Sequence, residues 1–338
     1  VGCRGVCIPV RRRVHQEMPT LIDPGPIVGR AGVGAVALGD HAFLVGGHSD
    51  RSPLKSLIGF APSDDPLSRG TWQELPPMQA RRSYLAVAAL GKQIYAIGGG
   101  ADNKMVNTME VFDTEKRESV AWFSLPPMQS KRMQHAAVAA EGKIFVAGGF
   151  DGTRDMPTCE YFDTARNQWL WLDSMSARRS YLALTVAGKH LLAIGGQDRL
   201  SGSGRAVSTV EAFDLWSERW YARPPLQAPR IGPAAVTLVG EFGEEVVYVC
   251  GGSDGEEVLA SVECYVANGE GGAWTAAPPM STPRISHGAV ALRNRLYVFG
   301  GSDGQTPLDT FECFDPKEGR WSPPVRMGNF PDLAKAAA

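Results

Sequence analysis

Two apolar runs separated by a short polar turn recur along the chain and predict pairs of adjacent β-strands. The clearest copy spans residues 82–89 and 93–98, with the turn Leu90-Gly91-Lys92 between the runs. Both runs are almost continuously apolar, which is typical of strands buried on both faces. A third strand is predicted at residues 108–113 and a fourth near Trp122. No helical period competes over any long window, so the pattern predicts an all-β protein.

This four-strand unit repeats about every 50 residues, a period that indicates a repeat architecture. In four copies, 26 positions separate the tryptophan of the unit from the first glycine of a Gly-Gly pair: Trp72 to Gly98, Trp122 to Gly148, Trp169 to Gly195, and Trp274 to Gly300. The spacing from Trp220 to Gly251 is 31, which indicates an insertion at residues 241–245. In the first copy Thr20 stands where the tryptophan is expected.

Glycine pairs and acidic–aromatic pairs mark fixed points in each copy. The pairs are Gly46-Gly47, Gly98-Gly99, Gly148-Gly149, Gly195-Gly196, Gly251-Gly252 and Gly300-Gly301. Glycine permits close backbone approach and positive φ at the end of the second strand. A glutamate with an aromatic residue two positions later follows in five copies: Glu110 and Phe112, Glu160 and Phe162, Glu211 and Phe213, Glu263 and Tyr265, and Glu312 and Phe314. The first copy has Ile58 and Phe60 instead.

The glycine pair, the later glutamate and aromatic residue, and the tryptophan together resemble kelch repeats. The resemblance covers residues 29–323 and implies a six-bladed kelch β-propeller with four antiparallel strands per blade. The blades would begin near Arg30, Arg82, Arg132, Arg179, Arg230 and Arg284. Residues 1–28 are expected to form an irregular leader, in which residues 15–19 could supply an outer strand that clasps the ring. Residues 324–338 are expected to form a C-terminal tail.

Composition narrows the functional classes. The 338 residues are 43% hydrophobic and 21% charged, as in an ordinary globular protein, and no apolar run is long enough to span a membrane. The net charge of −2 gives no overall reason to expect nucleic acid as a partner. The cysteines have no metal-binding spacing and four of them fall in predicted strands, which favours buried thiols and an intracellular, reducing compartment. The missing initial Met and the AKAAA ending are consistent with a piece of a longer product.

The most regular polar feature is the arginine that begins each blade. Because this position opens the innermost strand, the six arginines are expected to ring the mouth of the central channel. One interpretation makes them structural, through ion pairs or carbonyl hydrogen bonds between blades. The other makes them an anion-binding mouth, since guanidinium groups hold carboxylates bidentately. The predicted partner-binding residues are Arg82, Ser83, Tyr84, Arg132, His135, Arg179, Ser180, Tyr181, Arg230, Arg284 and His287.

The loops after the second strand of each blade add a charge asymmetry. Blades 2 to 4 contribute Lys104, Lys131, Arg154, Arg178, Arg199 and Arg205, whereas blade 5 contributes Asp254, Glu256 and Glu257. This asymmetry predicts a basic sector that takes an acidic peptide or loop. His135 and His287 occupy equivalent positions in opposite blades, where we expect solvated or hydrogen-bonded channel histidines. A metal ion across the channel would need a third ligand, so no metal site is predicted.

The tryptophans, the glycine pairs and the glutamates are expected to be structural. We expect Trp72, Trp122, Trp169, Trp220, Trp274 and Trp321 to pack between blades. The glutamates are expected to accept hydrogen bonds from backbone donors in neighbouring strands.

Two functional classes remain open at this point. The resemblance implies a protein-interaction module or scaffold without catalytic residues or cofactors, binding a protein partner and acting within a larger assembly such as a cullin-ligase adaptor. The alternative is an enzyme, because some kelch propellers are copper oxidases or sugar isomerases. No paired carboxylates, Ser–His–Asp set or phosphate-binding loop stands out in the sequence, and the cysteines are expected away from the axis. The sequence therefore favours binding over catalysis.

Overall fold

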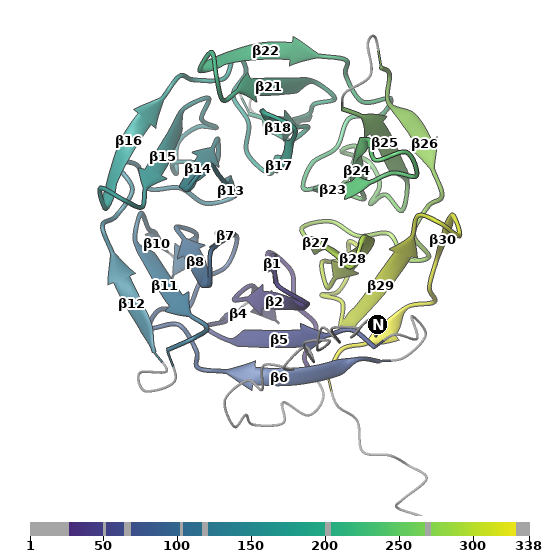
Figure 1. The fold of residues 1–338 in the computed structure, drawn as a ribbon, viewed down its shortest axis with the longest axis horizontal. Coiled ribbons are helices and arrows are strands. Elements are labelled where there is room, and N and C mark those ends of the chain that lie inside the picture. The colour runs from purple at the N-terminus through teal and green to yellow at the C-terminus, as the bar shows by residue number, and fades with distance from the viewer. Residues whose placement is uncertain are drawn as a thin grey trace, which may run out of the picture.

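The computed structural model describes residues 27–49, 52–63, 69–101, 104–116, 121–199, 204–267 and 272–328. Strands and turns make up this part of the chain, and no helix in it is long and apolar enough to cross a membrane. The strands form six antiparallel sheets arranged as blades around a central axis (Figure 1). The predicted six-bladed, all-β propeller is confirmed. Within each blade we call the strands a to d, from the axis outward.

The strand bounds are as follows, taken blade by blade. Blade 1 contains β1 (Gly34–Leu38), β2 (His41–Val45), β5 (Leu57–Ala61) and β6 (Thr71–Leu75). Blade 2 contains β7 (Ala86–Leu90), β8 (Gln93–Ile97), β11 (Met109–Asp113) and β12 (Trp122–Leu125). Blade 3 contains β13 (Ala136–Ala140), β14 (Lys143–Ala147), β15 (Cys159–Asp163) and β16 (Gln168–Leu172).

The second half of the ring repeats this order. Blade 4 contains β17 (Ala183–Ala187), β18 (His190–Ile194), β21 (Val210–Asp214) and β22 (Arg219–Arg223). Blade 5 contains β23 (Ala234–Val239), β24 (Glu245–Cys250), β25 (Val262–Val266) and β26 (Thr275–Ala277). Blade 6 contains β27 (Gly288–Leu292), β28 (Arg295–Phe299), β29 (Thr310–Asp315) and, pairing with β29, both β30 (Arg320–Trp321) and β31 (Val325–Arg326).

Three details differ from the sequence expectation. Strand a of blade 2 begins at Ala86 rather than Arg82, because Tyr84 adopts a left-handed backbone conformation with φ of 52° and interrupts the extended run. The outer strand of blade 6 continues to Arg326, so blade pairing reaches past residue 323. The outer strand proposed at residues 15–19 lies outside the described residues. Short two-stranded ribbons in the b–c loops were not predicted: β3 (His48–Ser49) with β4 (Ser52–Pro53), β9 (Gly100–Ala101) with β10 (Lys104–Met105), and β19 (Gln197–Asp198) with β20 (Arg205–Ala206).

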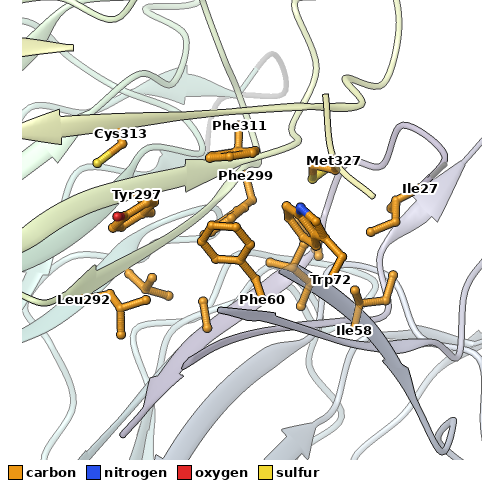
Figure 2. Close-up of a cluster of buried hydrophobic side chains, with 14 residues drawn as sticks. Ile27, Ile58, Phe60, Trp72, Leu292, Tyr297, Phe299, Phe311, Cys313 and Met327 are labelled. Atoms are coloured by element: carbon orange, nitrogen blue, oxygen red, sulfur yellow. The ribbon is translucent and has the colours of Figure 1, made fainter. Parts of the chain in front are cut away.

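The hydrophobic core is divided among the interfaces between neighbouring blades. At the interface of blades 1 and 6, Phe60 and Trp72 pack against Phe299 and Phe311, with ring centroids 5.1 to 6.0 Å apart (Figure 2). This interface therefore closes the ring with the same kind of packing that joins the other blades. Each blade takes its four strand positions from one continuous stretch of chain, as the sequence indicated.

The tryptophans of the outer strands join consecutive blades. The indole Nε1 of Trp122 in blade 2 donates to the carbonyl of Pro76, in the connection from blade 1, at 2.9 Å. Equivalent bonds run from Trp169 to Pro126, Trp220 to Asp173, Trp274 to Pro224, and Trp321 to Pro278. A buried aromatic ring with a satisfied N–H explains why tryptophan recurs at this position.

In the pair Gly98-Gly99, the first glycine lies against the backbone of the next blade and the second against that of its own blade. A Cβ atom on Gly98 would lie 2.8 Å from the carbonyl oxygen of Arg132, and one on Gly99 would lie 2.8 Å from that of Ser83. Both glycines also have positive φ, of 57° and 93°. Larger residues are therefore disfavoured at these two positions by contact and by backbone conformation.

Candidate functional site

The candidate site is the face of the ring formed by the d–a connections and the b–c loops, which we call the loop face. The opposite side, formed by the a–b and c–d turns, is called the turn face. The predicted partner-binding residues all lie at or just beneath the loop face. Burial and hydrogen bonding divide these residues into groups with different roles.

The blade-opening arginines lie inside the protein. Arg132 has 0% of its surface exposed, and its Nε donates to Oε1 of Glu160 at 3.0 Å. Its Nη1 donates to the carbonyls of Gly148 and Thr158, both at 2.7 Å. The same buried arginine–glutamate pair forms in Arg82–Glu110, Arg179–Glu211, Arg230–Glu263 and Arg284–Glu312.

Each of these arginines also joins two blades, because its backbone binds the preceding blade and its side chain binds its own blade. The amide of Arg132 donates to the carbonyl of Val106 in blade 2, and its own carbonyl accepts from Gly99 of blade 2. Its side chain meanwhile binds blade 3. The expected position of Arg82, Arg132, Arg179, Arg230 and Arg284 at the surface of the mouth is therefore corrected to the interior, where their donors are used by the protein itself.

The glutamates complete this arrangement from the third strand. Oε2 of Glu160 accepts from the amide of Gln129 at 2.8 Å, in the connection that leads to Arg132. Glu110, Glu211, Glu263 and Glu312 bind the equivalent connections in the same way. One carboxylate thus fixes both the guanidinium group and the preceding backbone turn.

Blade 1 lacks this pair. Arg30 is buried, but Ile58 occupies the glutamate position, and the guanidinium Nη1 donates to Oγ of Ser56 at 2.9 Å. Desolvation lowers the pKa of Arg30 to about 10, although the charge of Glu74 opposes the shift. The backbone role of Arg30 is retained, because its amide and carbonyl bind Leu308 and Gly301 of blade 6.

The two predicted channel histidines also lie between blades. His135 has 6% of its surface exposed, and its ring abuts Gly98 of blade 2. His287 packs against Gly251 of blade 5 in the same manner, with Nε2 3.4 Å from Sγ of Cys250. Burial, reinforced by nearby arginines, lowers the pKa of both histidines to about 3. They are buried, neutral packing residues, so the solvated form of the expectation is wrong, whereas the contact of His287 with Cys250 agrees with its hydrogen-bonded form.

Ser83 and Ser180 are buried as well and form backbone bridges to the b–c loops. Ser83 exchanges amide–carbonyl hydrogen bonds with Gly100, and Ser180 does so with Gln197. The position of these two serines at an accessible surface is therefore also corrected.

A closed ring of backbone hydrogen bonds lies just after the blade-opening arginines, and the sequence did not predict it. The position two residues after each arginine has a left-handed backbone, with φ between 52° and 62°. Its amide donates to the equivalent carbonyl of the preceding blade at 2.7 to 3.0 Å. The six residues, in ring order, are Gly32, Tyr84, Gln134, Tyr181, Gly232 and Ser286. A left-handed backbone costs an L-residue roughly 1–2 kcal/mol, so the non-glycine members are held there by the surrounding structure.

The side chains of this ring are large in blades 2 to 4 and small in blades 5, 6 and 1. Tyr84 and Tyr181 meet edge to face, with centroids 5.6 Å apart, although their blades are not neighbours. Gln134 lies between them in the ring and donates from Nε2 to the Tyr181 hydroxyl at 2.8 Å. Desolvation raises the pKa of both phenols. The sequence indicated the two tyrosines but not Gln134, whose only signal was its position two residues after Arg132.

Arg199 and Asp155 extend this cluster across the b–c loops of blades 3 and 4. Nη1 of Arg199 donates to Oδ1 of the buried Asp155 at 2.7 Å, and the guanidinium carbon lies 4.7 Å from the Phe150 ring centroid. The Arg199 amide binds Oδ2 of Asp155 at 2.6 Å. The loop face in this sector is therefore fixed by a buried carboxylate that no repeated feature of the sequence indicated.

Exposed charges surround the cluster unevenly. Lys104, Lys131, Arg154 and Arg205 are exposed, and Arg178 and Arg199 are partly so, all in blades 2 to 4. Glu256 and Glu257 are exposed in blade 5. Within the described part of the chain, no group of three or more His, Cys, Asp or Glu residues could hold a metal ion.

Comparison with family models shows matches along nearly the whole ring. The model described as the KLHDC2/KLHL20/DRC7 kelch-repeats domain matches residues 32–225 and 85–281, and the kelch motif matches residues 283–328. The solved structure of YjhT has a TM-score of 0.72 and covers 88% of this chain and 98% of its own. Because only 14% of residues are identical, this likeness shows the fold alone.

Curated relatives match parts of the chain. Kelch-like protein 34 from Homo sapiens is 34% identical over 128 residues, which are 37% of this chain and 19% of that protein. Alpha-scruin from Limulus polyphemus is 34% identical over 106 residues, which are 30% of this chain and 11% of that protein. The chain therefore matches less than a quarter of the length of either relative.

Proposed function

The chain belongs to the kelch-repeat family, and on this premise we propose that it is a protein-interaction module that binds an acidic peptide or loop on its loop face. Kelch-like protein 34 and alpha-scruin are among its relatives, and they support a role in binding rather than catalysis. One observation carries the choice of face and partner. The Tyr84–Gln134–Tyr181 cluster belongs to blades 2 to 4, whose loop-face segments also carry exposed basic side chains, whereas the loop of blade 5 carries exposed glutamates.

The buried arginines support the site without touching the partner. Their guanidinium groups hold the connections and strand ends beneath the loop face, so they fix the positions of the residues that contact a ligand. Tyrosine and arginine contribute strongly to interface energetics when they are rigid and central, as Tyr84, Tyr181 and Arg199 are. Basic side chains around such a centre favour an acidic partner and increase its association rate.

The test uses charge reversal at exposed residues, because substitution of the buried arginines would disturb folding. Lys104→Glu combined with Lys131→Glu changes two neighbouring loops on the loop face. Lys189→Glu combined with Lys317→Glu introduces the same change in charge on the turn face and serves as the matched control.

Each variant is used to capture proteins from cell extract at near-physiological salt, and the captured proteins are identified by mass spectrometry. A defined set of partners lost with the loop-face variant and kept with the control supports the proposal. Equal capture by both variants would move the interface away from the loop face. Absence of any captured partner with the unmodified chain would contradict the interaction role itself.

A further inference from the structure

The free edge of the outer strand of blade 4 lacks a cover that the outer strands of blades 2, 3 and 5 have. In blades 2, 3 and 5, a glutamine in the d–a connection donates from Nε2 to the outward carbonyl of the outer-strand tryptophan. These bonds are Gln79 to Trp122 at 2.7 Å, Gln129 to Trp169 at 3.3 Å, and Gln227 to Trp274 at 2.8 Å. Blade 4 has Ser176 at this position, so the described residues provide no such cover for the carbonyl of Trp220.

The edge of β22 is also long enough to pair with another strand. It has five residues, whereas β26 has three, and the outer strand of blade 6 is interrupted by Pro323 and Pro324. Prolines and short strands are devices that protect edges from pairing. In Figure 1, β22 lies at the outer rim of the ring.

Exposed aromatic and cationic residues accompany this uncovered edge. Trp216, in the turn that leads into β22, has 87% of its surface exposed, and Tyr221 has 46%. The hydroxyl of Ser217, the residue after Trp216, lies 3.3 Å from the hydroxyl of Tyr221. Arg219 and Arg223 lie at the two ends of the strand. Trp, Tyr and Arg are the residues most enriched at energetically important interface positions.

The two arginines have no carboxylate partner among the described residues. Arg223 contacts Nε2 of His190 at 3.2 Å. Asp214 lies opposite Arg219 in the sheet register, but its carboxylate accepts from the amides of Trp216 and Ser217 and lies 3.4 Å from His190. Both guanidinium groups are therefore available for an acidic ligand.

We propose that β22 is a second interaction surface, on which an extended acidic segment of a partner protein adds as a fifth strand to blade 4. Residues alternate between the two faces of a strand, so Arg219, Tyr221 and Arg223 share one face. An added strand places its own alternate residues opposite them. The favoured ligand is a five-residue pattern with carboxylates at its first and last positions and an apolar residue at the centre. Backbone pairing provides affinity in this mode, and the side chains provide specificity.

The probe is a fluorescent peptide that contains Glu-Thr-Ile-Thr-Glu, compared with a peptide in which both glutamates are lysine. Binding to the full chain is measured by fluorescence anisotropy. We expect the acidic peptide to bind at least about tenfold more tightly than the lysine peptide. Hydrogen exchange measured by mass spectrometry should show slower exchange at residues 216–223 when the acidic peptide is bound.

The decisive variant introduces the glutamine that covers the tryptophan carbonyl in the neighbouring blades 3 and 5. Ser176→Gln should place a side-chain amide on the Trp220 carbonyl and weaken peptide binding by about tenfold. The backbone amide of Ser176 binds Glu211, and this bond does not depend on the side chain. Arg219→Glu combined with Arg223→Glu should abolish binding of the acidic peptide and favour the lysine peptide.

Two results would overturn the proposal. One is an affinity for the acidic peptide that is unchanged by Ser176→Gln and by the arginine reversals. The other is an absence of binding and of slowed exchange at residues 216–223. Lys104→Glu with Lys131→Glu serves as a control that should leave this binding unchanged, which separates the outcome from that of the loop-face proposal.

Discussion

The amide of Gly32 in blade 1 donates to the carbonyl oxygen of Ser286 in blade 6 at 2.9 Å. This bond completes the ring of backbone hydrogen bonds around the axis, so the junction of the first and last blades has the same backbone pairing there as the others. Phe60, Trp72, Phe299 and Phe311 support the same junction from the core. Closure is therefore achieved by backbone pairing at the axis and by aromatic packing further out.

Substitution of a buried arginine is expected to destabilise the fold strongly. Arg82→Ala removes the partner of Glu110 and leaves a buried carboxylate, a change that typically costs about 3–5 kcal/mol. Arg81→Ala, at the exposed neighbouring position, should change stability by less than about 0.5 kcal/mol. Urea denaturation followed by tryptophan fluorescence measures both. Similar costs for the two variants would contradict the structural role of Arg82.

The unpaired arginine of blade 1 should be easier to replace. Arg30 has no glutamate at the position of Ile58, so its burial costs desolvation free energy without an ion pair in return. We expect Arg30→Met to destabilise the protein by about 2 kcal/mol less than Arg284→Met, which leaves the buried carboxylate of Glu312 without its cationic partner. Equal losses of unfolding free energy for the two variants in urea denaturation would indicate that the unpaired carboxylate of Glu312 costs little stability.

The buried histidines should make stability depend on pH in the mildly acidic range. Their pKa of about 3 in the folded state lies below the usual value of 6.5, so the unfolded chain binds more protons between these values. Stability is therefore fully present above pH 6.5 and declines toward pH 3, by at most about 1.4 kcal/mol per pH unit for each histidine.

A double variant isolates this contribution from that of the titrating carboxylates. Leu85 and Leu182 occupy the equivalent position in blades 2 and 4, so His135→Leu with His287→Leu uses a residue that the fold already accepts. We expect the variant to lose less stability between pH 6.5 and pH 4.5 in urea denaturation. Parallel pH profiles for the variant and the unmodified chain would exclude the histidines as the cause.

The backbone ring predicts a difference between two glycines that both have positive φ. A Cβ on Gly32 would lie 2.9 Å from the Tyr84 ring, whereas one on Gly91, in an exposed turn, meets nothing within 4 Å. Both alanine variants incur the left-handed backbone cost of roughly 1–2 kcal/mol, but only Gly32→Ala adds a steric conflict. Thermal denaturation should show the larger loss for Gly32→Ala. Equal losses would mean that Tyr84 moves aside freely.

The periodic features of the sequence predicted the architecture well, because each blade contains the same residues for the same reason. The tryptophans, glycine pairs and glutamates all make contacts that repeat in nearly every blade. Periodicity therefore predicted the number of blades and the order of strands in each.

The same periodicity could not distinguish a ring of exposed arginines from a ring of buried ones. Arg132 is buried because Glu160, 28 positions later, meets it across two strands, and the sequence presented the two residues as separate features. The roles of residues that do not repeat were harder still to predict. Asp155, Gln134 and Ser176 take their importance from neighbours in other loops or from a difference between blades, which only the three-dimensional arrangement reveals.

The junction between blades 6 and 1 has a consequence for how such a chain can be arranged. Every blade is one continuous stretch, and the Gly32–Ser286 bond gives this junction the same backbone pairing at the axis as the other five. The fold therefore has no privileged starting blade. A circular permutant that joins blade 6 to blade 1 and opens another d–a connection would contain the same contacts in a different order. The order of the blades along the chain is thus set by the gene, and the contacts of the ring do not depend on where the chain starts.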